Sequence, residues 1–264
     1  MNILQVIAGE TRERIAAQKQ KVPLGDVRRS AEQQTAAPDF TAALRQTGMS
    51  FICEAKKASP SKGLIAPTFP YLDIARDYEA AGAAAISCLT EPFRFLGDDR
   101  YLREIAETVS IPVLRKDFTV DEYMIYEARA LGAAAVLLIV SLLSEEELRA
   151  YRQLAEELGM AALVETHDER EIETALHSGA RILGVNNRDL TTFDVNLENS
   201  RRLRAMVPPD VVYVAESGIR APQDVAAMAA VGADAVLVGE MLMRASDKRA
   251  MLAEMRAAAE GASS

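Results

Sequence analysis

The sequence is poor in the residues that build disulfide frameworks and metal centres. It contains two cysteines, Cys53 and Cys88, and two histidines, His167 and His177. Both cysteines lie inside apolar segments, which favours buried thiols over a disulfide or a metal pair. The histidines are ten positions apart with no cysteine nearby, so the ligand number and spacing of a zinc site are missing.

Positive charge is also scarce, and no apolar run is long. With 30 basic and 39 acidic residues, the net charge is −9, which argues against a nucleic-acid surface because phosphate backbones require a clustered positive field. The longest apolar run, from Ala133 to Leu143, is well short of the roughly 20 residues that span a bilayer. The first residues contain no apolar stretch typical of a signal peptide. We therefore expect a cytoplasmic protein that binds neither nucleic acid nor membrane.

A repeated pattern runs along most of the chain. Four segments end a helical stretch at a glycine and continue as a short apolar run, namely AAGAAAISCL, ALGAAAVLLI, HSGARILGV and AVGADAVLVG. Their glycines are 50, 47 and 53 residues apart, an interval that suits two strand-helix units. Four further apolar segments lie between them: FICEAK, PVLRKD, AALVE and VVYVAE. Merged, the expected strands begin near residues 51, 84, 112, 134, 161, 181, 211 and 234.

Eight strands that alternate with helices predict an α/β fold with a parallel sheet. Eight such units in roughly 200 residues favour a closed (β/α)8 TIM barrel. The alternative is an open doubly wound sheet, but no GxGxxG follows the first strand. We expect residues 1–264 to form one barrel domain. Within it, residues 1–50 are expected to form a helical extension packed on the barrel, with helices at 2–21 and 38–47 joined by a polar segment.

Charged and amide side chains gather at the ends of the expected strands. Active groups of such barrels lie at the carboxyl ends of the strands. The candidates there are Glu54, Lys56, Lys116, Asp117, Glu165, Asn186, Asn187, Arg188, Glu216 and Ser217. Carboxylates and lysines at one mouth suit acid-base catalysis on an anionic substrate. Glu54 with Lys56, and Lys116 with Glu165, could instead be structural ion pairs that close the barrel top.

A phosphate site is expected beside the last two strands. Glycines in ESG, residues 216–218, and VGEMLM, residues 238–243, allow backbone amides to approach an anion. Barrel enzymes often bind phosphate at this place. Each glycine alone could merely permit a tight turn.

These motifs together resemble a known family. EAKKASPSKG, LRKDF, LVETH, GVNNRDLTTFDVN, AESGI and LVGEMLMR occur in order between Phe51 and Arg244. In this order and spacing they resemble indole-3-glycerol-phosphate synthase of tryptophan biosynthesis, and the N-terminal extension fits the extra helices of that family. The resemblance implies a phosphorylated small-molecule substrate, 1-(2-carboxyphenylamino)-1-deoxyribulose 5-phosphate. Its ring closure, with loss of carbon dioxide and water, gives indole-3-glycerol phosphate and requires no cofactor or metal.

The resemblance also implies residue roles. Lys116 looks like the principal general acid and Glu165 like the acid-base partner in dehydration, while Lys56 resembles a second lysine that holds substrate anions. Which lysine donates the first proton stays open. Glu54, Asn186 and Glu216 would orient these groups, and Arg188 would face the substrate carboxylate or brace the mouth. The phosphate would be surrounded by Ser59, Ser217, Gly218, Gly239 and Glu240, and the anthranilate ring by Phe95, Phe118, Leu137 and Leu190.

One position departs from the family pattern. A small hydroxyl residue often follows the last strand's glycine within two positions, whereas Glu240 and Met241 stand here. This change is tolerable if backbone amides bind the phosphate. We further expect Glu54 and Lys56 to face the substrate and SPSKG, residues 59–63, to form a mobile loop that closes over it.

Two other functions are compatible with a phosphate-binding barrel. Phosphoribosylanthranilate isomerase needs one acid and one base, which would leave the second lysine and the extra carboxylates without roles. A non-catalytic ligand-binding barrel would be expected to have lost a lysine or glutamate at the mouth, and none is lost here. The sequence is compatible with a monomer or a weak homo-oligomer.

Overall fold

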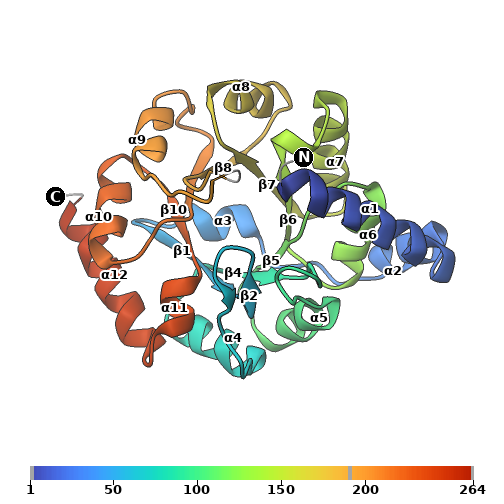
Figure 1. Ribbon diagram of the computed structural model, residues 1–264, viewed down its shortest axis with the longest axis horizontal. Helices are drawn as coiled ribbons and strands as arrows, with labels where there is room; N and C mark the ends of the chain where they lie inside the picture. Colours follow the sequence, from blue (N-terminus) through green and yellow to red (C-terminus); the bar gives the residue numbers. More distant parts are fainter. Residues whose placement is uncertain (1–2, 190–191, 263–264) are drawn as a thin grey trace.

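The expected strands form a closed parallel barrel. The computed structural model describes residues 3–189 and 192–262. Around the barrel the strands follow the order β1-β10-β9-β8-β7-β6-β5-β4 (Figure 1). Their bounds are β1 Ser50–Ala55, β4 Ala85–Leu89, β5 Val113–Lys116, β6 Ala135–Ile139, β7 Ala161–Thr166, β8 Ile182–Asn186, β9 Val212–Glu216 and β10 Ala235–Val238. The predicted barrel is confirmed, and the open doubly wound sheet is excluded.

Helices surround the barrel and alternate with its strands (Figure 1). They are α4 Tyr71–Ala80, α5 Asp99–Thr108, α6 Glu122–Ala130, α7 Glu145–Glu157, α8 Glu169–His177, α9 Glu198–Arg204, α10 Pro222–Ala230, α11 Glu240–Arg244 and α12 Lys248–Ala262, with a 3-10 turn η1 at Val140–Leu142. Side chains of Asp98, Asp121 and Asp168 cap the first turns of α5, α6 and α8. Of the described helices, none is long and apolar enough to cross a membrane.

The recurring glycines end helices. Gly82, Gly132, Gly179 and Gly232 follow α4, α6, α8 and α10 with φ of 82°, 89°, 87° and 78°. This left-handed conformation costs glycine little and lets the chain leave the helix toward the next strand. The repeat seen in the sequence is therefore the turn from helix into strand.

Strand alternation decides which side chains enter the barrel. Ile52, Leu114, Leu163 and Val214 belong to one buried cluster inside the barrel. Two residues further along each of these strands come Glu54, Lys116, Glu165 and Glu216. Because side chains two apart share a strand face, the polar layer lies directly above the apolar one. Cys53 and Cys88 point to the other face and are buried free thiols, as predicted.

A second cation on β5 faces outward. Arg115, only 1% exposed, lies between the barrel and its helices. Its guanidinium is 2.8 Å from Asp99 and 2.8 Å from Glu127, and it donates to the carbonyl of Met124 at 3.0 Å. Such a buried cation is tolerated because carboxylates and a carbonyl surround it. Adjacent residues on β5 thus send one cation into the barrel and one out of it.

The N-terminal extension contains three helices where two were predicted. They are α1 Ile3–Lys21, α2 Leu24–Glu32 and α3 Phe40–Leu44. The expected polar segment was wrong over residues 24–32. Val27 and Ala31, four positions apart, are buried on one face of α2, which packs against α6. The guanidinium of Arg28 also lies 4.7 Å from the ring centroid of Tyr126. Two small apolar residues gave too weak a pattern to predict this helix.

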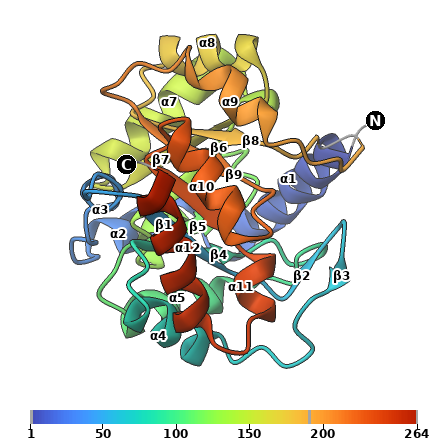
Figure 2. The same cartoon turned by 90° about the vertical axis from the view of Figure 1, so that its left-hand side faces the viewer.

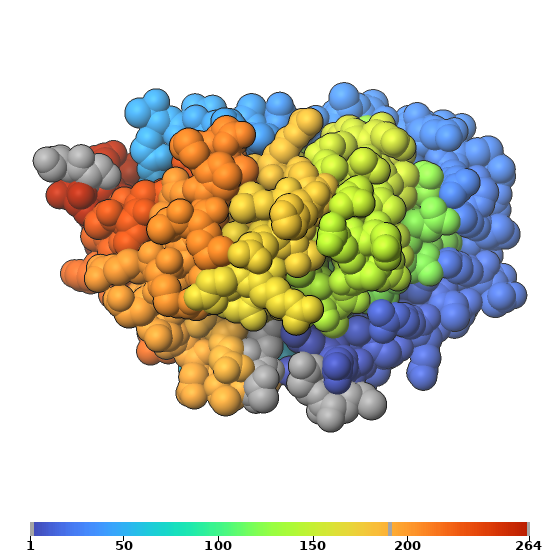
Figure 3. All heavy atoms as spheres, turned by 90° about the horizontal axis from the view of Figure 1, so that it is seen from above, coloured from blue at the N-terminus to red at the C-terminus, as the bar shows by residue number. Residues whose placement is uncertain are grey.

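The extension reaches both ends of the barrel. Figure 2 shows α1 and the hairpin of β2 (Ala58–Ser59) and β3 (Gly63–Leu64) on one side, and α3 on the opposite side. From α3, Phe40 and Leu44 join the apolar cluster inside the barrel. Arg14 of α1 pairs with Asp117, directly after β5, at 3.0 Å. In the space-filling view the blue extension lies against the green segments of the barrel without a gap (Figure 3).

Replacing Phe40 with alanine tests whether α3 stabilises the barrel. Phe40 is 1% exposed, so its truncation should lower the free energy of unfolding by about 3–5 kcal/mol through lost burial and a new cavity. Urea denaturation measures this change. Phe93→Ala is the control, since Phe93 is 60% exposed and its loss should change stability by about 0.5 kcal/mol or less. Equal stability of the two variants would contradict the packing of α3.

Candidate active site

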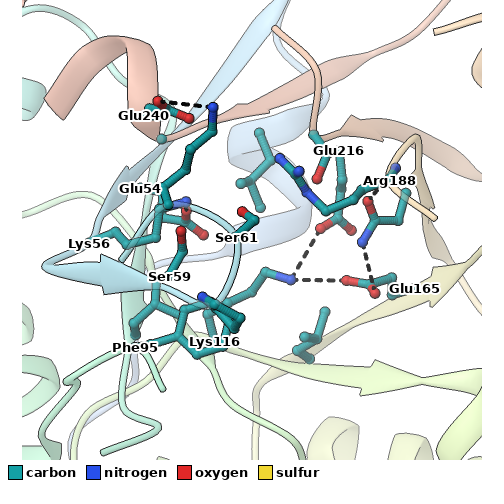
Figure 4. A pocket seen from close by; sticks show the side chains of 18 of the residues that line it. Glu54, Lys56, Ser59, Ser61, Phe95, Lys116, Glu165, Arg188, Glu216 and Glu240 are labelled. Carbon is teal, nitrogen blue, oxygen red and sulfur yellow. Dashed lines mark hydrogen bonds and ion pairs between the residues drawn. The ribbon is translucent and has the colours of Figure 1, made fainter. Parts of the chain in front are cut away.

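One cavity of about 380 Å³ lies at the carboxyl ends of the strands (Figure 4). Every residue predicted for catalysis or substrate binding that the structure describes lines it. These are Glu54, Lys56, Ser59, Phe95, Lys116, Phe118, Leu137, Glu165, Asn186, Arg188, Glu216, Ser217, Gly218, Gly239 and Glu240. Leu190 lies outside the described residues. Asp117 also contributes to the lining, whereas Asn187 holds a neighbouring turn by donating to the carbonyl of Glu216.

Lys116 lies between two buried carboxylates on the cavity floor (Figure 4). Its Nζ is 2.9 Å from Oε2 of Glu165 and 3.3 Å from Oε2 of Glu216. Asn186 donates from Nδ2 to Oε1 of Glu165 at 3.1 Å. These groups come from β5, β7, β8 and β9, whose register places Asn186 beside Glu216. The barrel therefore brings together residues spread over 100 positions of sequence.

The two glutamates differ in acidity because their surroundings differ. Burial would raise the pKa of Glu165, but the ammonium of Lys116 and then His167 lower it to about 2. For Glu216 burial dominates over the attraction of Lys116, and its pKa is raised to about 7. Burial disfavours the ammonium of Lys116, yet Glu165, Glu216 and Glu54 raise its pKa above the ordinary value. At neutral pH the floor thus holds a charged acid, an ionised carboxylate and a carboxyl near its titration point.

A second ion pair stands at the end of β1. Lys56 donates to Oε1 of Glu54, and both side chains are largely buried. Gly239 lies beside this pair, because a Cβ added there would come within 2.5 Å of the Glu54 carboxylate. The ion pairs Glu54–Lys56 and Lys116–Glu165, considered above as structural, are both present. Both also line the cavity, so they are accessible to a ligand.

Gly184 makes room for Glu216. It occupies the middle of β8 between Leu183 and Val185, and a Cβ there would lie 2.0 Å from Oε1 of Glu216. In the sequence this glycine belongs to the repeat and to the GVNNRDLTTFDVN motif, and neither pattern predicts its contact with Glu216. Its signal was a glycine inside an otherwise apolar strand, which marks a close approach by another group.

The end of the cavity where phosphate is expected combines turns from three loops. Ser217 has a φ of 64° and Gly218 of 94°. A left-handed conformation at a serine is strained and typical of functional sites. Helix α10 begins only at Pro222, so these two residues form a turn and not a helix start; α11 begins directly after Gly239. The carboxylate of Glu240 is engaged by Arg244 at 3.1 Å and Lys62 at 3.9 Å.

The opposite end of the cavity is apolar. Phe95 and Phe118 pack with ring centroids 6.1 Å apart, and Leu137 lies on the floor. Part of this wall was not predicted, because Ile3, Leu4 and Ile7 of α1 also line the cavity. In the sequence these residues look like any amphipathic helix, and nothing shows that the helix crosses the barrel mouth.

Two loops frame the entrance. The segment expected as a mobile loop is a short antiparallel hairpin, with Ala58 opposite Leu64 and Ser59 opposite Gly63, and Ser59 to Lys62 line the cavity. Arg188 donates from Nη1 to the carbonyl of Phe193 at 3.2 Å. Its backbone amide donates to Asn186 at 3.0 Å. Burial lowers the pKa of Arg188 relative to that of a free guanidinium.

Fold and site together define a class. A closed parallel barrel with lysines and glutamates around a substrate-sized cavity is an acid-base enzyme of the (β/α)8 class. Solved structures share the fold. 3-Hexulose-6-phosphate synthase from Salmonella typhimurium matches 81% of this chain and 100% of its own, with a TM-score of 0.65 and 16% identity. Thiamine phosphate pyrophosphorylase from Pyrococcus furiosus matches 85% of this chain and 99% of its own, with a TM-score of 0.62 and 19% identity.

Sequence comparison is more specific. The family model for indole-3-glycerol phosphate synthase matches residues 4–255. The indole-3-glycerol phosphate synthase of Ruminiclostridium cellulolyticum is 52% identical over 97% of this chain and 100% of its own length. The indole-3-glycerol phosphate synthase of Lacticaseibacillus paracasei is 50% identical over 96% of this chain and 98% of its own length. The chain belongs to the indole-3-glycerol phosphate synthase family, and its activity is that of a carboxy-lyase of tryptophan biosynthesis.

Gly184→Ala should impair turnover by displacing the Glu216 carboxylate. A shift of about 1 Å in a catalytic group can cost about a hundredfold in rate, so we expect kcat to fall between tenfold and roughly a hundredfold. Steady-state kinetics and circular dichroism measure activity and folding together. The control is Gly9→Ala, since no atom lies within 4 Å of a Cβ at that helical position. Unchanged kcat in Gly184→Ala would contradict this packing.

Glu216→Gln should alter the pH dependence of stability. A carboxyl with a pKa of about 7 in the folded protein and near 4.5 when unfolded holds its proton longer when folded. Its contribution to stability is therefore present below pH 4.5 and lost as the pH rises through 7. In urea unfolding, the free energy of unfolding of the variant should rise relative to that of the wild type between pH 4.5 and 8, by at most about 3 kcal/mol. Glu173→Gln, on the exposed face of α8, controls for a general charge effect.

Proposed function

We propose that this cavity closes the indole ring through acid-base groups on the barrel floor. The observation that carries the proposal is the placement of the Lys116 ammonium between Glu165 and Glu216. An aromatic wall lies on one side of the cavity, and the glycine turns of β9 and β10 lie on the other. The substrate carries an anthranilate ring at one end, a ketose in the middle and a phosphate at the other end. This order matches the aromatic wall, the acid-base floor and the glycine turns of the cavity.

Lys116 supplies the first proton in this proposal. The ring carbon that bears the carboxylate attacks the ketone carbon, and the ketone oxygen takes the proton from Nζ and becomes a hydroxyl. Carbon dioxide then leaves, and its bonding electrons restore the aromatic ring. Lys116 suits this role better than Lys56, because Lys116 lies on the floor beside the acid-base partner Glu165, whereas Lys56 lies at the side nearer Gly239. An acid near the developing charge accelerates such steps by about a hundredfold or more.

Dehydration follows and employs Glu165. Its ionised carboxylate removes a proton from the intermediate while the hydroxyl departs as water with a proton from a lysine. Asn186 orients the carboxylate through its 3.1 Å hydrogen bond, and Glu216 positions Lys116. Lys56 and Arg188 offer positive charge to the substrate's anions.

The phosphate is held by the strand-end turns. Ser217, Gly218 and Gly239 offer backbone amides, Ser59 offers a hydroxyl, and Glu240 contributes only its amide because its carboxylate pairs with Arg244. Glycine at 239 also leaves space beside Glu54 and Lys56. A biosynthetic enzyme with such a substrate acts in the cytoplasm, and we expect a monomer or a weak homo-oligomer.

The decisive experiment follows indole-3-glycerol phosphate by fluorescence, with wild type beside Lys116→Ala and Glu165→Gln. Both variants should lose about a hundredfold or more in kcat, because each removes a proton-transfer group. Binding of the reduced, unreactive substrate analogue should persist. Lys57→Ala is the matched control, since this neighbouring lysine does not line the cavity. Wild-type protein that binds substrate without turnover would favour a non-catalytic ligand-binding barrel.

A further inference from the structure

His167 lies directly behind the catalytic floor. It follows Glu165 by two residues at the end of β7, and it is not among the residues that line the cavity. Nε2 of the imidazole is 3.4 Å from Oε1 of Glu165, and among the residues that the structure describes it has no hydrogen-bond partner. Nδ1 is 2.9 Å from Oε2 of Glu171. The ring therefore bridges a catalytic carboxylate and a second carboxylate nearer the surface.

Three hydrogen bonds fix the backbone of His167 and the position of its partner Glu171. The backbone amide of His167 donates to the same oxygen of Glu171 at 2.8 Å, and Glu171 is in turn held in the first turn of α8, where its amide donates to Asp168. From α9, Asn199 donates to the carbonyl of His167 at 3.1 Å. Side-chain exposure is 19% for His167 and 17% for Glu171. The backbone of His167 is thus held from both sides, and Glu171 also holds Nδ1 of the imidazole.

The charged groups that face His167 are carboxylates. They are Glu165 on β7, Glu171 on α8 and Glu216 on β9. Arg202, on α9, is instead engaged by Glu169. Burial, the largest influence, disfavours the imidazolium, but the hydrogen bond to Glu171 and the three carboxylates outweigh it, so the pKa of His167 is raised. The ring therefore holds its second proton more tightly than a free histidine does, and in the doubly protonated ring Nε2–H points at Glu165.

The proposed reaction consumes one proton more than the substrate supplies. A carboxylate that leaves as neutral carbon dioxide donates its electron pair to the ring, while the phosphate keeps its charge. Each turnover from carboxylate to indole therefore consumes one proton from outside the substrate. Bound substrate fills the cavity and excludes water from the floor. The proton must then be stored nearby before the substrate binds.

Resting on the proposed function, we propose that His167, held by Glu171, stores this proton and lends it to Glu165 during turnover. The Nε2–H bond breaks, a bond from the proton to Oε1 of Glu165 forms, and the imidazole becomes neutral. After the carboxyl turns, the proton reaches Nζ of Lys116, which is 2.9 Å from Glu165 and has given its own proton to the substrate. After product release, water in the open cavity reprotonates Glu165, and Glu165 reloads His167. His167 is a positioning residue, since it acts through Glu165.

The test is the pH profile of kcat for His167→Gln. Glutamine can still donate a hydrogen bond toward Glu165 but cannot store a proton. We expect kcat at neutral pH to fall roughly tenfold to a hundredfold, at the low end of proton-transfer effects. The alkaline decline of the wild-type profile should disappear. Glu171→Gln should keep the histidine but shift the alkaline decline toward lower pH, because one carboxylate that stabilises the imidazolium is gone.

Controls separate this inference from the proposed function. His177→Gln replaces an exposed histidine at the end of α8, the helix that carries Glu171, and its kcat should match that of the wild type at every pH. Proton storage alone would be overturned if the wild type is active and Glu165→Gln is impaired, but His167→Gln has the pH profile of the wild type. A profile for His167→Gln that is lower but parallel to wild type at every pH would also overturn it and indicate a purely structural role. No turnover in wild type would instead overturn the proposed function.

Discussion

The site depends on one buried ammonium. Lys116 is enclosed by the barrel, and burying it is favourable only because Glu165 and Glu216 lie within 3.3 Å. The same enclosure makes the carboxylates unequal, with one held ionised and the other near its titration point. Removing Lys116 leaves the ionised carboxylate of Glu165 uncompensated in the barrel, so stability and acidity are tied to the same side chains.

Small residues make this arrangement possible. Glu216 reaches the floor because Gly184 has no side chain, and Glu54 occupies its place because Gly239 has none. The barrel interior is filled by apolar side chains up to the layer just below. The polar layer therefore has a solid base, which holds proton donors and acceptors at fixed distances and avoids the cost of reordering them during the reaction.

Much of this was predictable from local patterns. Each strand start fell within one residue of prediction, because apolar runs after glycine are strong signals, and strand alternation correctly placed Glu54, Lys116, Glu165 and Glu216 at one mouth. The features that were missed depend on contacts between residues that are distant in the sequence. Helix α2 has only two buried side chains, and nothing local shows that Ile3 and Ile7 form a cavity wall. His167 was considered as a zinc ligand and as the last residue of LVETH, and its contact with Glu171 was not predicted because it depends on how α8 begins.

The opposed cations of β5 have a consequence for folding errors. Lys116 finds its carboxylates inside the barrel, and Arg115 finds Asp99 and Glu127 outside it. If β5 paired one residue out of step, either Leu114 would take the place of Arg115 beside Asp99 and Glu127, or Asp117 would take the place of Lys116 beside Glu165 and Glu216. Either slip would leave one group of carboxylates without its cation, which is costly where these charges are buried. The buried ion pairs of β5 thus discriminate against the wrong alignment of this strand.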